Sequence, residues 1–199
     1  MKQITSIYKK EKNKIRFRLN EFKSLPESNY IKELFFCLLT PQSNAKKCWT
    51  AVEKIFSLTN PSQEQILQIL KTHTRFHNNK TRYLLEAKEK WSEIKNKLSE
   101  DKTIETRNWL AENVKGYGLK EAGHFLRNIG KSNNEIAILD RHILRNLVTL
   151  KIIEEEEIKN KKHYLEIEKK FLALAKSIKI PIDELDLLFW SKENGEIFK

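Results

Sequence analysis

Four of the five glycines in this 199-residue sequence fall within fifteen residues, at Gly116, Gly118, Gly123 and Gly130. Gly116 and Gly118 stand between two segments with helical spacing, in VKGYGLKEA. Glycines two apart allow a tight turn with positive φ, and bare backbone N–H groups at the start of a helix can approach a phosphate. The segment therefore predicts a phosphate-binding hairpin between two helices, although a simple helix–helix turn would also explain these glycines.

A lysine and an aspartate follow the hairpin at positions where they could do chemistry. Lys120 lies two residues after Gly118, and Asp140 lies twenty residues after Lys120. A lysine amine can form a covalent bond with an electrophilic carbon, and a carboxylate can stabilise developing positive charge. The structural alternatives are a solvated lysine at a helix start and a helix N-cap at Asp140.

The elements that must position these residues are helices. Most segments show the apolar spacing of amphipathic helices, and none shows convincing strand alternation. We expect helices over residues 31–38, 48–56, 61–70 with Asn60 as N-cap, 84–98, a segment ending near 110, 119–129 with Gly130 as the stop, 143–150, 164–178, and from Pro181 onward. The fold class is therefore all-α.

The cysteines and most tryptophans fit a helical core. Cys37 and Cys48 are the only cysteines and lie in apolar helical patterns, so we expect reduced core thiols and no metal site. Two cysteines also exclude a four-cysteine iron–sulfur cluster. Trp49, Trp91 and Trp109 lie in helical stripes, which favours core packing for all three.

The net charge points to a polyanionic partner. The chain has 38 Lys and Arg against 27 Asp and Glu, a formal charge of +11, and such a balance favours nucleic acid through counterion release. No apolar run is long enough to span a bilayer, and residues 1–20 lack the apolar core of a secretory signal. We therefore expect a cytoplasmic protein that binds nucleic acid and not a membrane.

Several motifs together resemble one enzyme family. VKGYGLKEA followed by ILDRH resembles the helix-hairpin-helix DNA glycosylase superfamily, and LLTPQSNA at 38–45, TRFHNNK at 74–80 and FWSKENGEIFK at 189–199 resemble its archaeal-type 8-oxoguanine DNA glycosylase/AP lyase family. The resemblance covers most of the chain in order. It implies an all-α helix-hairpin-helix glycosylase fold, with two packed helical lobes and the active site in the cleft between them. It also implies a single unit over residues 1–199, with the hairpin at about 105–130.

The resemblance assigns the chemistry to Lys120 and Asp140. The lysine amine would displace the base at C1′ and remain linked to the sugar as an iminium, which permits β-elimination. The carboxylate would stabilise positive charge on the sugar and assist deprotonation of the amine. The implied enzyme is a DNA N-glycosylase and AP lyase that excises 8-oxoguanine and cleaves the strand 3′ to the abasic site, with no cofactor.

Other residues are assigned to the substrate by the same resemblance. Phe76 and Trp190 would sandwich the extruded base, the carboxylate of Lys199 would turn back to the base pocket, and Gln42 and Ser43 would contact the flipped nucleotide. Core packing of the two aromatic rings and a frayed tail are the structural alternatives. Phe76 favours the functional role because it lies in a polar segment, RFHNN.

Five residues would contact the DNA backbone: Lys115, Gly116, Gly118, Arg141 and His142. His142 could equally be a structural histidine. The implied partner is double-stranded DNA that contains 8-oxoguanine, and we expect the protein to act as a monomer.

The loop before Asp140 departs from the superfamily pattern. It reads EIAILD and lacks the Gly-Pro pair of the wider superfamily, so the resemblance does not define its geometry. Two other functions stay open from the sequence. One is a glycosylase for other damage, such as oxidised pyrimidines or alkylated purines. The other is a non-catalytic helix-hairpin-helix DNA-binding module, in which Lys120 and Asp140 would be incidental.

Overall fold

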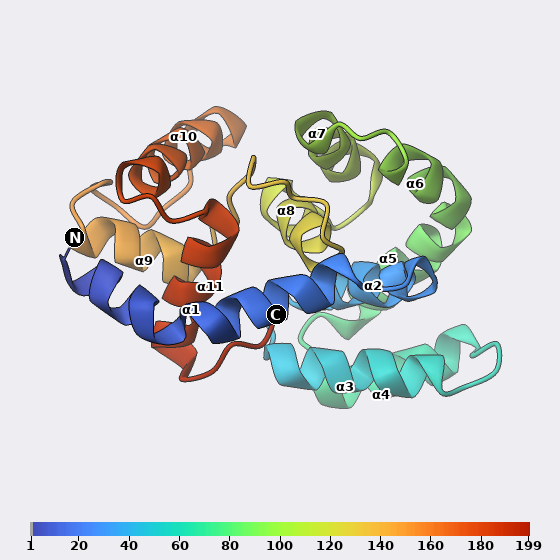
Figure 1. The fold of residues 1–199 in the computed structure, drawn as a ribbon. Coiled ribbons are helices and arrows are strands. Elements are labelled where there is room, and N and C mark those ends of the chain that lie inside the picture. Colours follow the sequence, from blue (N-terminus) through green and yellow to red (C-terminus); the bar gives the residue numbers. More distant parts are fainter. Residues whose placement is uncertain (1) are drawn as a thin grey trace. The chain divides into compact units, whose positions relative to one another are not determined.

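The computed structural model describes the backbone of residues 2–199 and the side chains of residues 3–192 and 195–199. Every regular element in this part of the chain is helical (Figure 1), which confirms the all-α prediction. The elements in chain order are α1 Lys2–Lys23, the 3-10 helix η1 Glu27–Asn29, α2 Tyr30–Leu39, α3 Ala45–Phe56, α4 Gln63–His73, α5 His77–Glu89, α6 Trp91–Leu98, α7 Thr103–Asn113, α8 Leu119–Asn128, α9 Arg141–Thr149, α10 Lys161–Ser177 and α11 Ile182–Asn194.

The helices form two compact units. The central unit is Leu25–Phe125, and the terminal unit combines the residues up to Ser24 with Leu126–Lys199. The division falls inside α8, so the helix that follows the hairpin begins in one unit and ends in the other. No helix in the described residues is both long and apolar enough to cross a membrane.

The central unit is built around α2. Eight of the ten residues of α2 are buried, because its sequence is apolar on nearly every side. Cys37 and Cys48 are free and buried, as the sequence predicts. Trp49, Trp91 and Trp109 are half-buried, and the Trp49 ring packs edge-on against the buried Phe36 ring at 5.7 Å between centroids.

Two helix boundaries in the central unit differ from the sequence prediction. Asn60 is not the N-cap of α4, because Ser62 and Gln65 form a reciprocal capping box: the Gln65 N–H donates to Ser62 Oγ (3.2 Å), and the Ser62 N–H donates to Gln65 Oε1 (2.8 Å). The expected helix over 84–98 is two helices separated at Lys90. The apolar stripe continues across this one-residue break, so periodicity alone does not reveal it.

The terminal unit contains a helix that the sequence analysis does not predict. Helix α1 carries eight Lys and Arg and two Glu. Its buried side chains are Ile4, Tyr8, Ile15 and Phe22, and the last three are spaced at seven residues. It packs against α11 (Figure 1). Seven-residue spacing brings side chains back to the same face of a helix after two turns, so this sparse stripe is sufficient to bury one side.

Helix α8 ends at Asn128 in the terminal unit, and Gly130 provides the stop, as predicted. The N–H of Lys131 donates to the Leu126 carbonyl (2.8 Å), and the N–H of Gly130 donates to the Arg127 carbonyl (3.0 Å), with Gly130 at φ +71°. This is a Schellman motif, which favours glycine because φ is positive.

Three acidic side chains near the start of α11 are buried, and partners in the terminal unit compensate them. Ser132 Oγ donates to Asp183 Oδ2 (2.6 Å), Tyr8 and Arg16 bind Glu184, and Arg127 lies 3.3 Å from Asp186. Burial raises the pKa of the Asp183 carboxyl above its ordinary value of 3.8, while the Ser132 hydroxyl and the Arg127 charge oppose that shift.

We predict that Asp183→Asn makes the thermal stability of the protein less dependent on pH. A raised folded-state pKa means that the stabilising contribution of the protonated carboxyl is fully present below pH 3.8 and is lost as pH rises through the folded pKa. The amide cannot ionise and can still accept from Ser132. The difference in melting temperature, variant minus wild type, should therefore be larger at pH 7 than at pH 4. An equal difference at the two pH values would contradict the assigned cost of burying this charge.

Candidate active site

The predicted hairpin is present as the turn between α7 and α8. Gly116 has φ +91°, and a Cβ at this position would lie 2.5 Å from Tyr83 Cδ2. The Tyr117 side chain is buried, and its hydroxyl donates to the Leu34 carbonyl (3.0 Å). The turn is therefore attached to the core of the central unit at a position where only glycine fits without strain.

Gly118 has a different role from the one its spacing suggests. Its φ is not positive, and its N–H donates to Glu121 Oε2 (3.1 Å). Glu121 is the third residue of α8, so this bond is one half of a capping box. Of the two hairpin glycines, Gly116 alone uses the conformational freedom of glycine, and the Gly118 N–H already has an acceptor in this structure.

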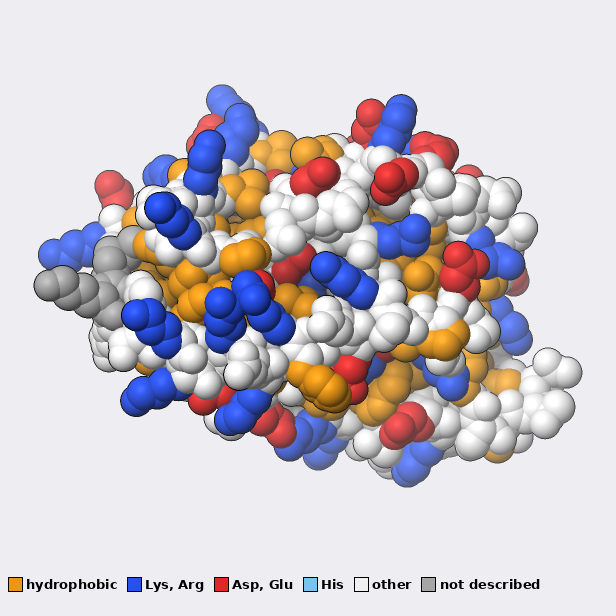
Figure 2. Space-filling model, viewed as in Figure 1, with side chains coloured by type: hydrophobic (Ala, Val, Ile, Leu, Met, Phe, Trp, Pro, Cys, Tyr) orange, Lys and Arg blue, Asp and Glu red, His pale blue; other side chains and the backbone are white. Residues whose placement is uncertain are grey.

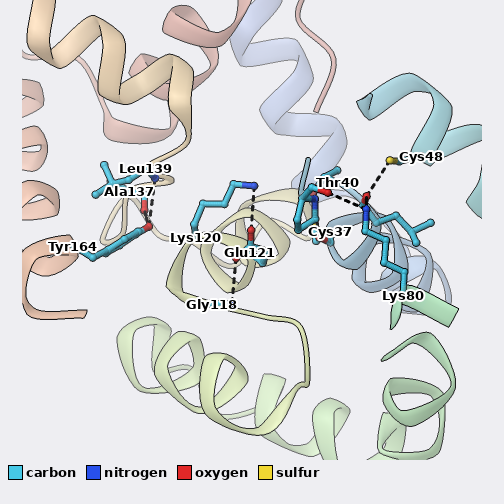
Figure 3. Close-up of polar contacts among 12 residues, drawn as sticks. Cys37, Thr40, Cys48, Lys80, Gly118, Lys120, Glu121, Ala137, Leu139 and Tyr164 are labelled. Atoms are coloured by element: carbon cyan, nitrogen blue, oxygen red, sulfur yellow. Dashed lines mark hydrogen bonds and ion pairs between the residues drawn. The ribbon is translucent and has the colours of Figure 1, made fainter. Parts of the chain in front are cut away.

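Lys120 lies in the first turn of α8 beside the same carboxylate. Its Nζ is 3.3 Å from Glu121 Oε1, and its side chain is 23% exposed. One carboxylate oxygen of Glu121 therefore accepts from the Gly118 N–H, and the other lies beside the Lys120 amine (Figure 3). The sequence reasoning missed Glu121, although the spacing of Gly118 and Glu121 is the signal for a capping residue.

Asp140 is the N-cap of α9 in the terminal unit. Its Oδ1 accepts from the N–H groups of His142 and Ile143, each at 2.8 Å. Among the described residues no donor binds its Oδ2, and the side chain is half-buried. The capping role is therefore present, and one carboxylate oxygen stays available for another partner.

The loop before Asp140 is held by α10, without the Gly-Pro pair of the superfamily. The Tyr164 hydroxyl donates to the Ala137 carbonyl (2.8 Å) and accepts from the Leu139 N–H (3.3 Å), as Figure 3 shows. Glu168, one turn further along α10, accepts from the Ala137 N–H (2.9 Å). These two side chains fix the residues that lead into the N-cap.

Gln42, Ser43 and Phe76 lie on two neighbouring segments of the central unit. Gln42 and Phe76 have φ of 54° and 57° and are both exposed, Phe76 by 52%. Ser43 Oγ accepts from the Arg75 N–H (3.0 Å), so it joins the turn after α2 to the residue before Phe76. Phe76 is therefore outside the core, as its polar neighbours predict.

Lys80 is a buried lysine beneath these segments that the sequence reasoning missed. Its Nζ donates to the Leu39 carbonyl (2.7 Å), the Pro41 carbonyl (2.9 Å) and Ser43 Oγ (2.8 Å). Burial lowers the pKa of Lys80 to about 8; the Cys48 thiol opposes this shift, and the charges of Arg75 and Lys120 add to it. Figure 3 shows Lys80 and Cys48 meeting at one carbonyl oxygen, that of Leu39.

Trp190 and Lys199 belong to the terminal unit. Trp190 is half-buried in α11, and Lys199 is buried. Arg18 Nε donates to the Phe198 carbonyl (2.6 Å), which holds the tail against α1. The structure therefore disagrees with a frayed tail.

The residues expected to contact the DNA backbone lie mostly at the surface. Lys115 and Arg141 are exposed, and Lys115 lies 3.4 Å from Glu86 Oε1. His142 is half-buried, and its Nδ1 is buried without a hydrogen-bond partner among the described residues. Lys and Arg side chains are spread over the visible face with Asp and Glu among them (Figure 2). In the described part of the chain, no three His, Cys, Asp or Glu side chains are grouped to hold a metal ion.

We predict that the two hairpin glycines differ in their tolerance of alanine. Gly116→Ala places a Cβ against Tyr83 at a positive φ, and should lower the free energy of unfolding by about 2 kcal/mol. In Gly118→Ala the new Cβ would contact only Glu121 Oε2, at 3.3 Å. This substitution should change the free energy of unfolding by about 1 kcal/mol or less. Urea denaturation of both variants measures this difference. Equal losses would contradict the assigned hairpin geometry.

Comparisons with known proteins agree with this architecture. A family model described as 8-oxoguanine DNA glycosylase matches residues 15–180. An 8-oxoguanine DNA glycosylase/AP lyase of Fusobacterium nucleatum is 43% identical, over 99% of this chain and 96% of the relative. The one from Methanocaldococcus jannaschii is 33% identical over 92% and 90%.

Solved structures of such enzymes are similar over the whole chain. The 8-oxoguanine DNA glycosylase of Thermotoga maritima has a TM-score of 0.89 at 29% identity and covers 100% of this chain and 97% of its own. The M. jannaschii 8-oxoguanine glycosylase/lyase, solved in complex with a 15mer DNA containing 8-oxoguanine, has a TM-score of 0.89 at 30% identity and full coverage of both chains. The family match, the identity to curated relatives and the helix-hairpin-helix fold agree, and this chain belongs to the 8-oxoguanine DNA glycosylase family.

Proposed function

We propose that this protein is a bifunctional DNA repair enzyme that excises 8-oxoguanine from double-stranded DNA and then cleaves the strand. The observation that carries the proposal is Lys120, placed in the first turn of α8 directly after the glycine hairpin and beside Glu121, in a chain that belongs to this family. Residues 1–199 act as one catalytic unit, as a monomer in the cytoplasm.

Lys120 is the nucleophile in this proposal. Its deprotonated Nζ attacks C1′ of the flipped nucleotide, and the bond from C1′ to the base breaks as the base leaves with a proton. The sugar ring then opens to an iminium on Lys120. Loss of a C2′ proton expels the 3′ phosphate by β-elimination, which cleaves the strand on the 3′ side, and water releases the lysine.

Asp140 supplies the essential carboxylate. Its Oδ1 is already bound by two N–H groups of α9, so Oδ2 is the oxygen that stabilises positive charge on the sugar and assists deprotonation of the amine. The same N–H groups hold the carboxylate in one orientation, so the cap and the catalytic role are compatible.

Recognition of the substrate is assigned to the residues that the family resemblance implies. Phe76 and Trp190 stack on the extruded base, which offsets the free energy of flipping it, while Gln42, Ser43 and Lys199 contact the nucleotide. The DNA backbone is bound by Lys115, Gly116, Gly118, Arg141 and His142. None of these steps requires a metal ion or a cofactor.

We predict that borohydride links the wild-type protein covalently to a duplex that contains 8-oxoguanine. Lys120→Gln should give no adduct, because an amide cannot form the iminium that borohydride reduces. Lys88→Gln is the matched control, since Lys88 is an exposed lysine on α5, and it should give the wild-type yield. An adduct that persists in Lys120→Gln would contradict the assigned nucleophile.

Two substitutions separate the catalytic role of Asp140 from its role as a cap. Asp140→Asn keeps an oxygen that accepts from α9, so its melting temperature should stay close to that of the wild type while single-turnover excision falls at least about 100-fold. Asp140→Ala loses the cap as well and should cost about 1 kcal/mol of stability. Full activity in Asp140→Asn would show that Asp140 is a cap only.

A further inference from the structure

Lys80 is buried among oxygen atoms that carry no formal charge. It is 4% exposed, and its Nζ donates to the carbonyls of Leu39 and Pro41 and to the hydroxyl of Ser43. A protonated lysine has three donors and no acceptor, so these bonds use its whole capacity. The ammonium therefore fixes the end of α2 and the turn that follows it.

The same arrangement limits what the Ser43 hydroxyl can do. A hydroxyl has one hydrogen to donate and two lone pairs to accept with. Ser43 Oγ accepts from the Arg75 N–H (3.0 Å) and from the Lys80 ammonium (2.8 Å), and both of these groups can only donate. Within the described residues, the Ser43 hydrogen has no acceptor, and the side chain is only half-buried.

We propose that Lys80 is a positioning residue that commits the Ser43 hydroxyl to donating a hydrogen bond, and that Ser43 uses it to bind a carbonyl oxygen of the damaged base. This inference rests on the proposed function and goes beyond it by giving Ser43 a direction and a target atom. 8-Oxoguanine has carbonyl oxygens at C6 and C8, and its N7 carries a hydrogen. A donor therefore matches a carbonyl oxygen of the lesion and is mismatched to its N7.

The neighbours of Ser43 favour the base over a phosphate as the source of that oxygen. Ser43 follows Gln42 in the chain, and its Oγ accepts a hydrogen bond from the N–H of Arg75, the residue before Phe76. Both neighbours are exposed and have positive φ. Phosphate contact is the competing target, and it would serve any nucleotide regardless of its base.

The pKa of Lys80 gives the arrangement a testable pH dependence. Above about pH 8 the amine loses its proton and gains a lone pair that can accept the Ser43 hydrogen, which withdraws that hydrogen from the base. The titratable neighbours of Lys80 are the Cys48 thiol of α3, Arg75 before α5 and Lys120 of α8. Burial raises the pKa of Cys48 to about 11, so the thiol stays neutral across this pH range.

The experiment compares two reactions of the 199-residue protein. One is excision from a duplex with 8-oxoguanine, and the other is strand cleavage at a preformed abasic site, which has no base to contact. Ser43→Ala should reduce single-turnover excision about ten-fold, the effect of one lost hydrogen bond, and leave cleavage at the abasic site unchanged. Ser57→Ala, an exposed serine at the end of α3, is the matched control and should change neither reaction.

Lys80 variants test the positioning role. Lys80→Met should reduce excision by a similar factor, and the double variant with Ser43→Ala should be no worse than Lys80→Met alone, because both remove the same contact. Lys80→Arg keeps a permanent donor and should restore part of the excision. Lys88→Met removes the same charge from an exposed site on the same helix and should leave both reactions unchanged. Melting temperatures show whether each variant folds. If Lys80→Met does not fold, the comparison of excision with abasic-site cleavage in Ser43→Ala is the test.

The pH profile adds a readout that a purely structural lysine would not change. The ratio of excision to abasic-site cleavage should fall between pH 7 and pH 9 in the wild type and stay flat in Ser43→Ala. Lys120 acts in both reactions, so effects of pH on the shared chemistry cancel in the ratio.

The outcomes separate the inference from the function on which it rests. Wild-type protein that does not excise 8-oxoguanine would overturn the proposed function and this inference together. Normal excision by Ser43→Ala, beside an active wild type, would overturn the inference alone. An equal loss of both reactions in Ser43→Ala would also overturn it, because that result indicates contact with a phosphate and not with the base.

Discussion

The hydrogen bond from the buried Tyr117 hydroxyl to the Leu34 carbonyl is the contact on which the geometry of the central unit depends. It attaches the hairpin turn to α2, the most deeply buried helix of that unit. Five residues further along α2, the Leu39 carbonyl accepts from both Cys48 and Lys80. The same helix therefore fixes the segment before Lys120 and the turn that carries Gln42 and Ser43, by backbone oxygens that a change of side chain cannot remove.

The terminal unit buries several charged groups within its apolar core, and these groups need partners. The acidic residues of α11 are compensated by partners on α1, at the end of α8 and in the loop that follows α8. Removing one partner of such a buried pair leaves a charge without compensation, which destabilises the fold. Asp140 is likewise a carboxylate whose charge is compensated by hydrogen-bond donors. Two N–H groups of α9 satisfy one of its oxygens, and the second oxygen is available for chemistry.

The sequence predicted the parts of the fold that rest on local rules. Glycine spacing identified the hairpin, periodicity identified most helices, and polar neighbours placed Phe76 outside the core. Lys80 could not be found in this way, because its partners are backbone carbonyls about forty positions away, at Leu39 and Pro41. Helix α1 was missed because its apolar stripe is sparse among eight basic residues, and Tyr164 and Glu168 act on a loop to which no local pattern connects them.

The whole mechanism requires Lys120 to form the covalent bond to the sugar, and the position of the reduced adduct along the chain is the decisive measurement. Wild-type protein is reacted with a duplex that contains 8-oxoguanine in the presence of borohydride, then digested with protease, and the modified residue is identified by mass spectrometry. We expect the sugar to be attached to Lys120. Attachment to Lys80 or to any other amine, or excision without any adduct, would contradict it.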